Sequence, residues 1–150
     1  MKILFAVGLV VVTVIIHAVA FHTLLGAMMR SHAFTMSGFG PVVGLVVALT
    51  CWLILIHLAE ISVWGLFYFW QGCLPDADSA WYFSGVTYTG SGYGDLVLSR
   101  EWRKFAPVET TTGLLMYGLS TGLFFAIVQR WITNWMRGEL EPHGGAPINE

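Results

Sequence analysis

A run of alternating glycines is the feature of this sequence with the most direct chemical consequence. Gly90, Gly92 and Gly94 occupy every second position between Thr89 and Asp95, in the string Thr-Gly-Ser-Gly-Tyr-Gly-Asp. Because glycine adopts positive φ without steric cost, this spacing allows successive carbonyl oxygens to point the same way. Carbonyl oxygens arranged in this way can replace the water shell of a cation. The string therefore predicts a backbone that coordinates a metal cation.

A second candidate site is an ionisable pair within an apolar run. His57 and Glu60 are three residues apart, which places them on one face of a helix. Ionisable residues in a membrane segment are rare and indicate a functional site. We expect this pair to brace neighbouring structure by hydrogen bonds, while metal ligation and proton sensing remain open. His17 and His22 lie five residues apart and point about 140° away from each other, so we expect histidines bonded within the bundle or at an interface.

The composition places these residues in a membrane protein. Of the 150 residues, 56% are hydrophobic and 11% are charged, and the mean hydropathy is +0.70. A soluble domain carries roughly 25% charged residues. The net charge of −2 gives no basis for nucleic-acid binding. The two cysteines, Cys51 and Cys73, match neither a disulfide framework nor a metal-ligand spacing.

Three apolar runs are long enough to cross a bilayer, which takes roughly 20 residues. They lie at residues 1–28, 41–70 and 107–135. The first run could also be a signal peptide, since Lys2 precedes its apolar stretch. We favour a spanning helix because the run continues through Leu25. A polar loop at 29–40 joins the first two spans. Residues 136–150 form a C-terminal tail, of which we expect residues 141–150 to be disordered, while residues 129–140 continue as an interfacial segment.

The sequence between the second and third spans predicts a short helix. Pro75 suits the residue just before a helix, and Asp76 or Asp78 can cap it. A helix over residues 78–88 is on the order of 16 Å long, about half a membrane. Residues 90–95 then form the glycine segment, and Glu109 suits the start of the third span.

The string Gly92-Tyr93-Gly94-Asp95 resembles the signature of the small prokaryotic pore-loop potassium channels of the two-transmembrane type. The preceding half-helix is part of the resemblance, including its aromatic residues Trp81, Tyr82 and Phe83. The match covers roughly residues 41–135, so the N-terminal helix is an addition. It implies an all-α membrane protein with three transmembrane helices, a re-entrant pore helix (78–89) and an extended selectivity filter, assembled as a homotetramer.

The resemblance also implies a role for individual residues. The expected filter is Thr89, Gly90, Ser91, Gly92, Tyr93, Gly94 and Asp95, with K⁺ at the carbonyls of Gly90, Ser91, Gly92 and Tyr93. The expected filter support is Trp81, Tyr82, Phe83, His57 and Glu60, with Tyr93 pressing on the three aromatic residues. We expect His57 and Glu60 to face the pore helix and to hold the region of Tyr93 and Asp95 by hydrogen bonds behind the filter. Gly113 or Gly118 would be the hinge of the inner helix (107–135).

Membrane placement follows from the same resemblance. It implies a multi-pass protein of the cell (inner) membrane in contact with lipid, with the filter mouth and the N-terminus outside. The loop at 29–40 and the tail at 136–150 would be cytoplasmic. It implies passive transport of K⁺, no cofactor, no nucleic-acid partner and no enzymatic activity.

The filter departs from the family pattern Thr-Thr-Val-Gly-Tyr-Gly-Asp at two positions. Gly90 replaces the second threonine, and Ser91 replaces the branched apolar residue. We therefore expect a potassium-preferring channel with weakened discrimination against Na⁺. One alternative is a non-conducting accessory or sensor subunit with a pore-like fold. Another is an intramembrane enzyme that uses His17, His22, His57 and Glu60, which would require a metal.

Overall fold

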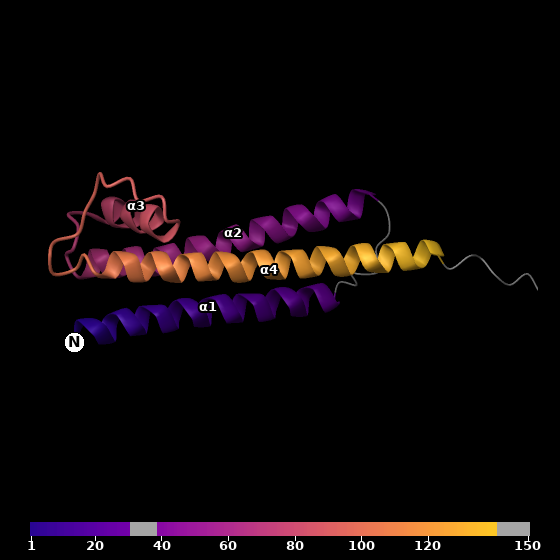
Figure 1. Cartoon of the computed structure of the whole chain (residues 1–150), viewed down its shortest axis with the longest axis horizontal. Coiled ribbons are helices and arrows are strands. Elements are labelled where there is room, and N and C mark those ends of the chain that lie inside the picture. Colours follow the sequence, from indigo (N-terminus) through magenta and orange to yellow (C-terminus); the bar gives the residue numbers. More distant parts are fainter. Residues whose placement is uncertain (31–38, 141–150) are drawn as a thin grey trace, which may run out of the picture.

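The computed structural model describes residues 1–30 and 39–140, and these residues form four helices and no strand (Figure 1). The helices are α1 (Lys2–Arg30), α2 (Phe39–Trp70), α3 (Ala77–Tyr88) and α4 (Phe105–Leu140). Three segments are long and apolar enough to cross a membrane, namely Lys2–Arg30, Gly40–Trp70 and Phe105–Asn134. The predicted all-α membrane fold is therefore confirmed.

The three long helices run side by side, and α3 lies beside one end of the bundle (Figure 1). That end also holds the N-terminus of the chain, the last turns of α2 and the first turns of α4. α3 packs against α2 and α4, and α1 also packs against α2 and α4. Because α2 ends and α4 begins at the same end, the chain enters and leaves the α3 region from one side. α3 is thus a re-entrant helix of 12 residues.

Local sequence sets both ends of α3. Asp76 is its N-cap, with extended backbone (φ −149°), and its carboxylate accepts a 2.7 Å hydrogen bond from the Ser79 N–H. The bonds from Ser79 lower the pKa of this exposed carboxyl group, so it is ionised at the positive end of the helix. At the other end the Thr89 N–H donates to the Gly85 carbonyl, and Gly90 then turns away with φ +75°. Of the two predicted caps, the structure uses Asp76.

Aromatic residues of α2 and α3 fill the core between α2, α3 and α4. Trp64, Tyr68 and Tyr88 are fully buried there. Two glycines let the neighbouring helices approach the backbone of α3. A Cβ at Gly65 would lie 3.1 Å from Trp81 Cα, and a Cβ at Gly113 would overlap the carbonyl oxygen of Tyr88. Small residues at helix contacts have this effect in membranes.

Several helix ends differ from the predicted boundaries. α2 begins at Phe39, so Pro41 stands in its first turn, where a missing N–H costs no helical hydrogen bond. α4 begins at Phe105 and continues to Leu140, so residues 136–140, which were assigned to the C-terminal tail, belong to the helix. Most of the loop predicted at 29–40 and the tail residues 141–150 lie outside the described residues.

Candidate ion-conduction site and its buried support

The segment between α3 and α4 has the backbone that the glycine spacing predicts. Gly90, Gly92 and Gly94 have φ of +75°, +55° and +77°. We call residues 90–95 the filter segment. All six are exposed in the single chain. The filter segment is therefore accessible at the surface of the single chain.

Hydrogen bonds fasten the inner part of the filter segment to the end of α3. The Gly90 N–H donates to the Thr87 carbonyl at 3.0 Å, and the Gly92 N–H donates to the Val86 carbonyl at 3.2 Å. The Thr110 hydroxyl of α4 donates to the same Thr87 carbonyl at 2.8 Å. These donors occupy carbonyl groups that a helix end leaves without intrahelical partners. The negative end of the helix dipole lies beside the segment and favours a cation there.

Asp95 marks the outer end of the filter segment. The Tyr82 hydroxyl donates a 2.8 Å hydrogen bond to Asp95 Oδ2. This bond lowers the pKa of the Asp95 carboxyl group and raises the pKa of the Tyr82 phenol. Both groups are exposed, so a negative charge stands at the end of the segment in contact with solvent.

The three predicted aromatic supports lie in different surroundings. Tyr82 bonds to Asp95, whereas Phe83 is buried against Tyr68 with its ring 5.2 Å away, edge to face. Trp81 Nε1 donates to the Ser62 hydroxyl of α2 at 3.1 Å. Tyr93 is 73% exposed in the single chain. Its expected contact with these aromatic residues stays a prediction about neighbouring subunits.

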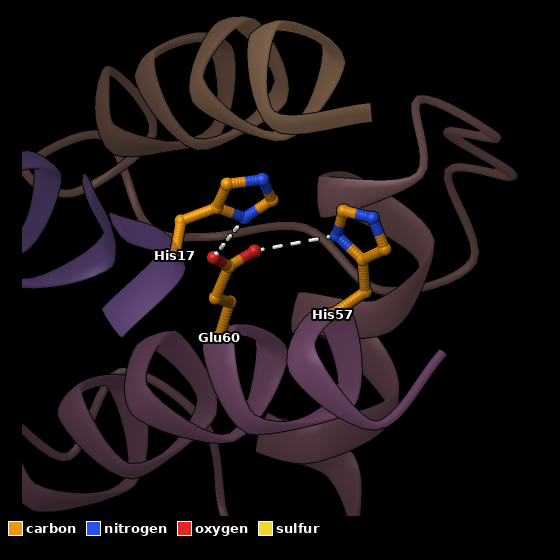
Figure 2. A group of neighbouring side chains, drawn as sticks. All are labelled: His17, His57 and Glu60. Atoms are coloured by element: carbon orange, nitrogen blue, oxygen red, sulfur yellow. Dashed lines mark hydrogen bonds and ion pairs between the residues drawn. The ribbon is translucent and has the colours of Figure 1, made fainter. Parts of the chain in front are cut away.

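His57 and Glu60 belong to a buried polar cluster (Figure 2). The cluster lies next to Tyr88, the last residue of α3. His17 Nδ1 lies 2.8 Å from Glu60 Oε1, and His57 Nδ1 lies 3.3 Å from Glu60 Oε2. The Tyr88 hydroxyl donates to Glu60 Oε2. Ser120 Oγ lies 3.0 Å from His57 Nε2 and 3.4 Å from His17 Nε2. We call these five residues the Glu60 cluster; they come from all four helices.

The Glu60 cluster agrees with part of the expected brace. Glu60 does bond to α3, the expected pore helix, through Tyr88. In the described part of the chain none of the cluster's hydrogen bonds reaches Tyr93 or Asp95, and Asp95 accepts from Tyr82 instead. His17 is bonded within the bundle, as expected, while His22 is exposed. The sequence did not indicate that the partner of His17 is Glu60. The sequence did signal that His17 needs some partner, because a histidine buried in an apolar span requires one.

A second buried carboxylate was also missed. Glu109 is fully buried, accepts from the Tyr68 hydroxyl at 2.7 Å and lies 2.5 Å from the Ser84 hydroxyl oxygen. Ser84 Oγ also lies 2.8 Å from the carbonyl oxygen of Ile61. From the sequence, Glu109 indicated only the start of a helix. Its burial comes from the packing of α3 on α4.

Within the described residues, the nitrogen and oxygen atoms of His17, His57 and Glu60 lie within 4.8 Å of one another. Imidazole and carboxylate groups at this spacing could hold a divalent metal ion. The same side chains also find hydrogen-bond partners within the protein, since no buried side-chain nitrogen or oxygen in the described part lacks one.

Comparison with known proteins identifies the family. A family model described as "Ion channel" matches residues 43–130, which is more than half of the chain. No curated protein and no solved structure matches. The matched residues include most of α2, all of α3, the filter segment and most of α4, whereas α1 lies outside them. The chain therefore belongs to this ion channel family.

Proposed function

We propose that this chain forms a homotetrameric, potassium-preferring cation channel in the cell (inner) membrane. The observation that carries the proposal is the filter segment, with positive φ at Gly90, Gly92 and Gly94 directly after a half-length helix. One such segment cannot surround an ion, so several copies must share an axis. Carbonyl groups of residues 90–93 from each copy would then replace the water shell of K⁺.

Exposure of the filter segment supports assembly. Backbone polar groups at membrane depth need partners, because lipid offers none. The filter segment is exposed in one chain and would find those partners in bound ions, water and neighbouring subunits. A cation is favoured over an anion by the end of α3 at Thr89 and by the ionised Asp95.

The two departures from the potassium-channel pattern bear on selectivity. Thr89 Oγ1 and Ser91 Oγ lie 3.0 Å apart, so Ser91 interacts with the preceding residues instead of presenting a branched apolar side chain. Gly90 has φ +75°, where a β-branched residue is strained. Gly90→Thr thus requires a different backbone at this position. We propose that discrimination against Na⁺ is weakened, and that Ser91→Val is the informative single change.

Purified protein in lipid vesicles and planar bilayers tests the proposal. We expect a tetramer by mass measurement, K⁺ flux, and a reversal potential that shifts when K⁺ is exchanged for Na⁺. Gly92→Ala should abolish flux, because its φ of +55° is unfavourable for alanine. Gly72→Ala is the matched control, since Gly72 has φ +62° outside the filter segment.

Each outcome has a defined meaning. A monomeric protein, or equal flux in Gly92→Ala and wild type, contradicts the channel proposal. An unchanged reversal potential on exchange of the two cations contradicts potassium preference. A tetramer without flux supports the second candidate, a non-conducting accessory or sensor subunit, which the replaced residues at 90 and 91 favour.

A further inference from the structure

The Glu60 cluster is one hydrogen short when its histidines are neutral and its carboxylate is ionised. The Tyr88 hydrogen goes to Glu60 Oε2, which is the shorter of its two contacts. His57 Nδ1 lies 3.3 Å from both Glu60 Oε2 and the Tyr88 oxygen, so it faces two acceptors and needs a hydrogen, as His17 Nδ1 does beside Glu60 Oε1. Each neutral imidazole with a hydrogen on Nδ1 has only a lone pair on Nε2. Both Nε2 atoms face the Ser120 hydroxyl, which carries a single hydrogen. One Nε2 would therefore face an oxygen lone pair.

One added proton completes every bond in the Glu60 cluster. If one histidine carries it, the Nε2–H of that ring donates to Ser120, and Ser120 donates to the other ring. If Glu60 carries it, the carboxyl group donates to His17 Nδ1, and the His17 Nε2–H donates to Ser120. In both arrangements each polar atom has a partner and the cluster has no net charge. The need for one proton does not depend on which group holds it.

Burial raises the free-energy cost of leaving the Glu60 cluster without the added proton. Glu60 is fully buried, His17 is 2% exposed, and both lie in spans that face lipid. An unpaired carboxylate is costly there. The titratable groups that face Glu60 are His17 from α1, His57 from α2, Tyr88 from α3 and Tyr117 from α4, whose ring packs 4.1 Å from that of His57. A proton on the carboxylate or on a histidine removes the net negative charge, whereas a divalent ion would leave the cluster positive.

We propose that His17, His57 and Glu60 form a binding site for one proton, and that this proton joins α1 to the pore-forming helices α2 and α4. The site is separate from the filter segment. It gives α1, which lies outside the residues matched by the channel family, a defined attachment to them.

A site that binds one proton in the folded protein makes folding stability depend on pH. In the unfolded chain, two histidines with pKa values of about 6.5 share one proton on average near pH 6.5. Above that pH the folded site binds more protons than the unfolded chain, so stability falls as pH rises. Below it the unfolded chain binds more, so stability falls as pH falls. The contribution of the site is therefore largest near pH 6.5.

Glu60→Gln is the sharpest variant, because the amide copies a protonated carboxyl group. Its NH₂ can donate to His17 Nδ1 and its oxygen can accept from His57 and Tyr88, so all bonds are complete without an added proton. We expect the variant to fold and to match wild type near pH 6.5. Between pH 7 and 9 the unfolding midpoint of wild type should fall by up to about 4 °C per pH unit more than that of the variant.

Two further variants serve as a pair. His17→Gln removes one of the two rings that can hold the proton and leaves a single Nε2 facing Ser120, so its pH dependence should be smaller than that of wild type. His22→Gln is the matched control on the same helix, where the side chain is exposed, and it should keep the wild-type dependence. Glu101→Gln, at an exposed carboxylate, should keep it as well.

The outcomes decide the proposal without any measurement of conduction. Equal pH slopes in wild type and Glu60→Gln overturn it, and so does a Glu60→Gln protein that fails to fold. One divalent metal ion per chain by elemental analysis, together with a lower unfolding midpoint after chelation, would show a metal in place of the proton. If the unfolding midpoints show the predicted pH dependence but the wild-type protein conducts no ions, only the proposed function is contradicted.

Discussion

Glu60 and Glu109 are two buried carboxylates that both fasten α3, yet their partners differ. Glu109 contacts the hydroxyl groups of Tyr68 and Ser84, whereas Glu60 contacts two imidazoles and one hydroxyl group. Ser84 has one hydrogen and two acceptors, Glu109 and the Ile61 carbonyl. All three groups are satisfied when Glu109 is a carboxylic acid that donates to Ser84. In that arrangement the proton of the Glu109 site is held by one residue, whereas the proton proposed for the Glu60 cluster satisfies its bonds on the carboxylate or on either histidine.

The two sites also join different parts of the molecule. Glu109 connects α2, α3 and α4, all of which contain residues matched by the channel family. The Glu60 cluster adds α1 to these helices. On these assignments a neutral Glu109 holds together the helices matched by the channel family, whereas the attachment of α1 depends on the proposed proton of the Glu60 cluster.

The largest expected effect comes from removing the Glu60 side chain. Glu60→Ala leaves both imidazoles and the Tyr88 hydroxyl buried without their acceptor, and we expect a loss of about 3–5 kcal/mol in the free energy of unfolding. Denaturant unfolding in detergent measures it. Glu109→Ala leaves only the Tyr68 hydroxyl without its acceptor, because Ser84 keeps its bond to the Ile61 carbonyl, and it should cost less. An equal loss in the two variants would contradict the distinction between the sites.

Gly113→Ala displaces the end of α3 without changing either carboxylate. The new Cβ would overlap the Tyr88 carbonyl oxygen, so we expect a loss of about 1–3 kcal/mol and impaired flux. Gly118→Ala is the control, because a Cβ there meets nothing within 4 Å. Thermal unfolding and vesicle flux check both. Altered flux with unchanged stability in Gly118→Ala would instead assign the hinge to that residue.

Glu109→Gln should change little. The amide can donate to Ser84 and accept from Tyr68, as the carboxylic acid does, so we expect a change within about 1 kcal/mol. Unfolding midpoints at pH 5 to 7 measure it, with wild type as the reference. A strong destabilisation in this range would show that Glu109 is ionised, and the contrast with Glu60 would fail.

The smallest effect concerns the exposed Asp95. Tyr82→Phe removes the hydrogen bond that lowers the pKa of Asp95, so that pKa should rise. Protonation of Asp95 should then reduce K⁺ current at a slightly higher pH than in wild type. Current recorded while the outer bath is acidified checks the direction. A shift to lower pH, or no shift, would remove this role of Tyr82.

The sequence alone determined the features that depend on neighbouring residues along the chain. Apolar length predicted the three spanning helices, Asp76 and Pro75 predicted the start of α3, and alternating glycines predicted the positive φ values of the filter segment. These features follow from local hydrogen bonding and steric freedom, which the residue types fix by themselves.

Only the tertiary structure decided how the helices meet. His17 and Glu60 are 43 residues apart, and nothing in either helix alone specifies the other as its partner. The family resemblance makes Gly113 a candidate hinge. The structure shows in addition that Gly113 lies against Tyr88, where there is room for a hydrogen atom but not for a Cβ. Such pairings depend on the rotation of each helix about its axis, and in lipid that rotation is set by close packing and by buried polar groups that must find partners.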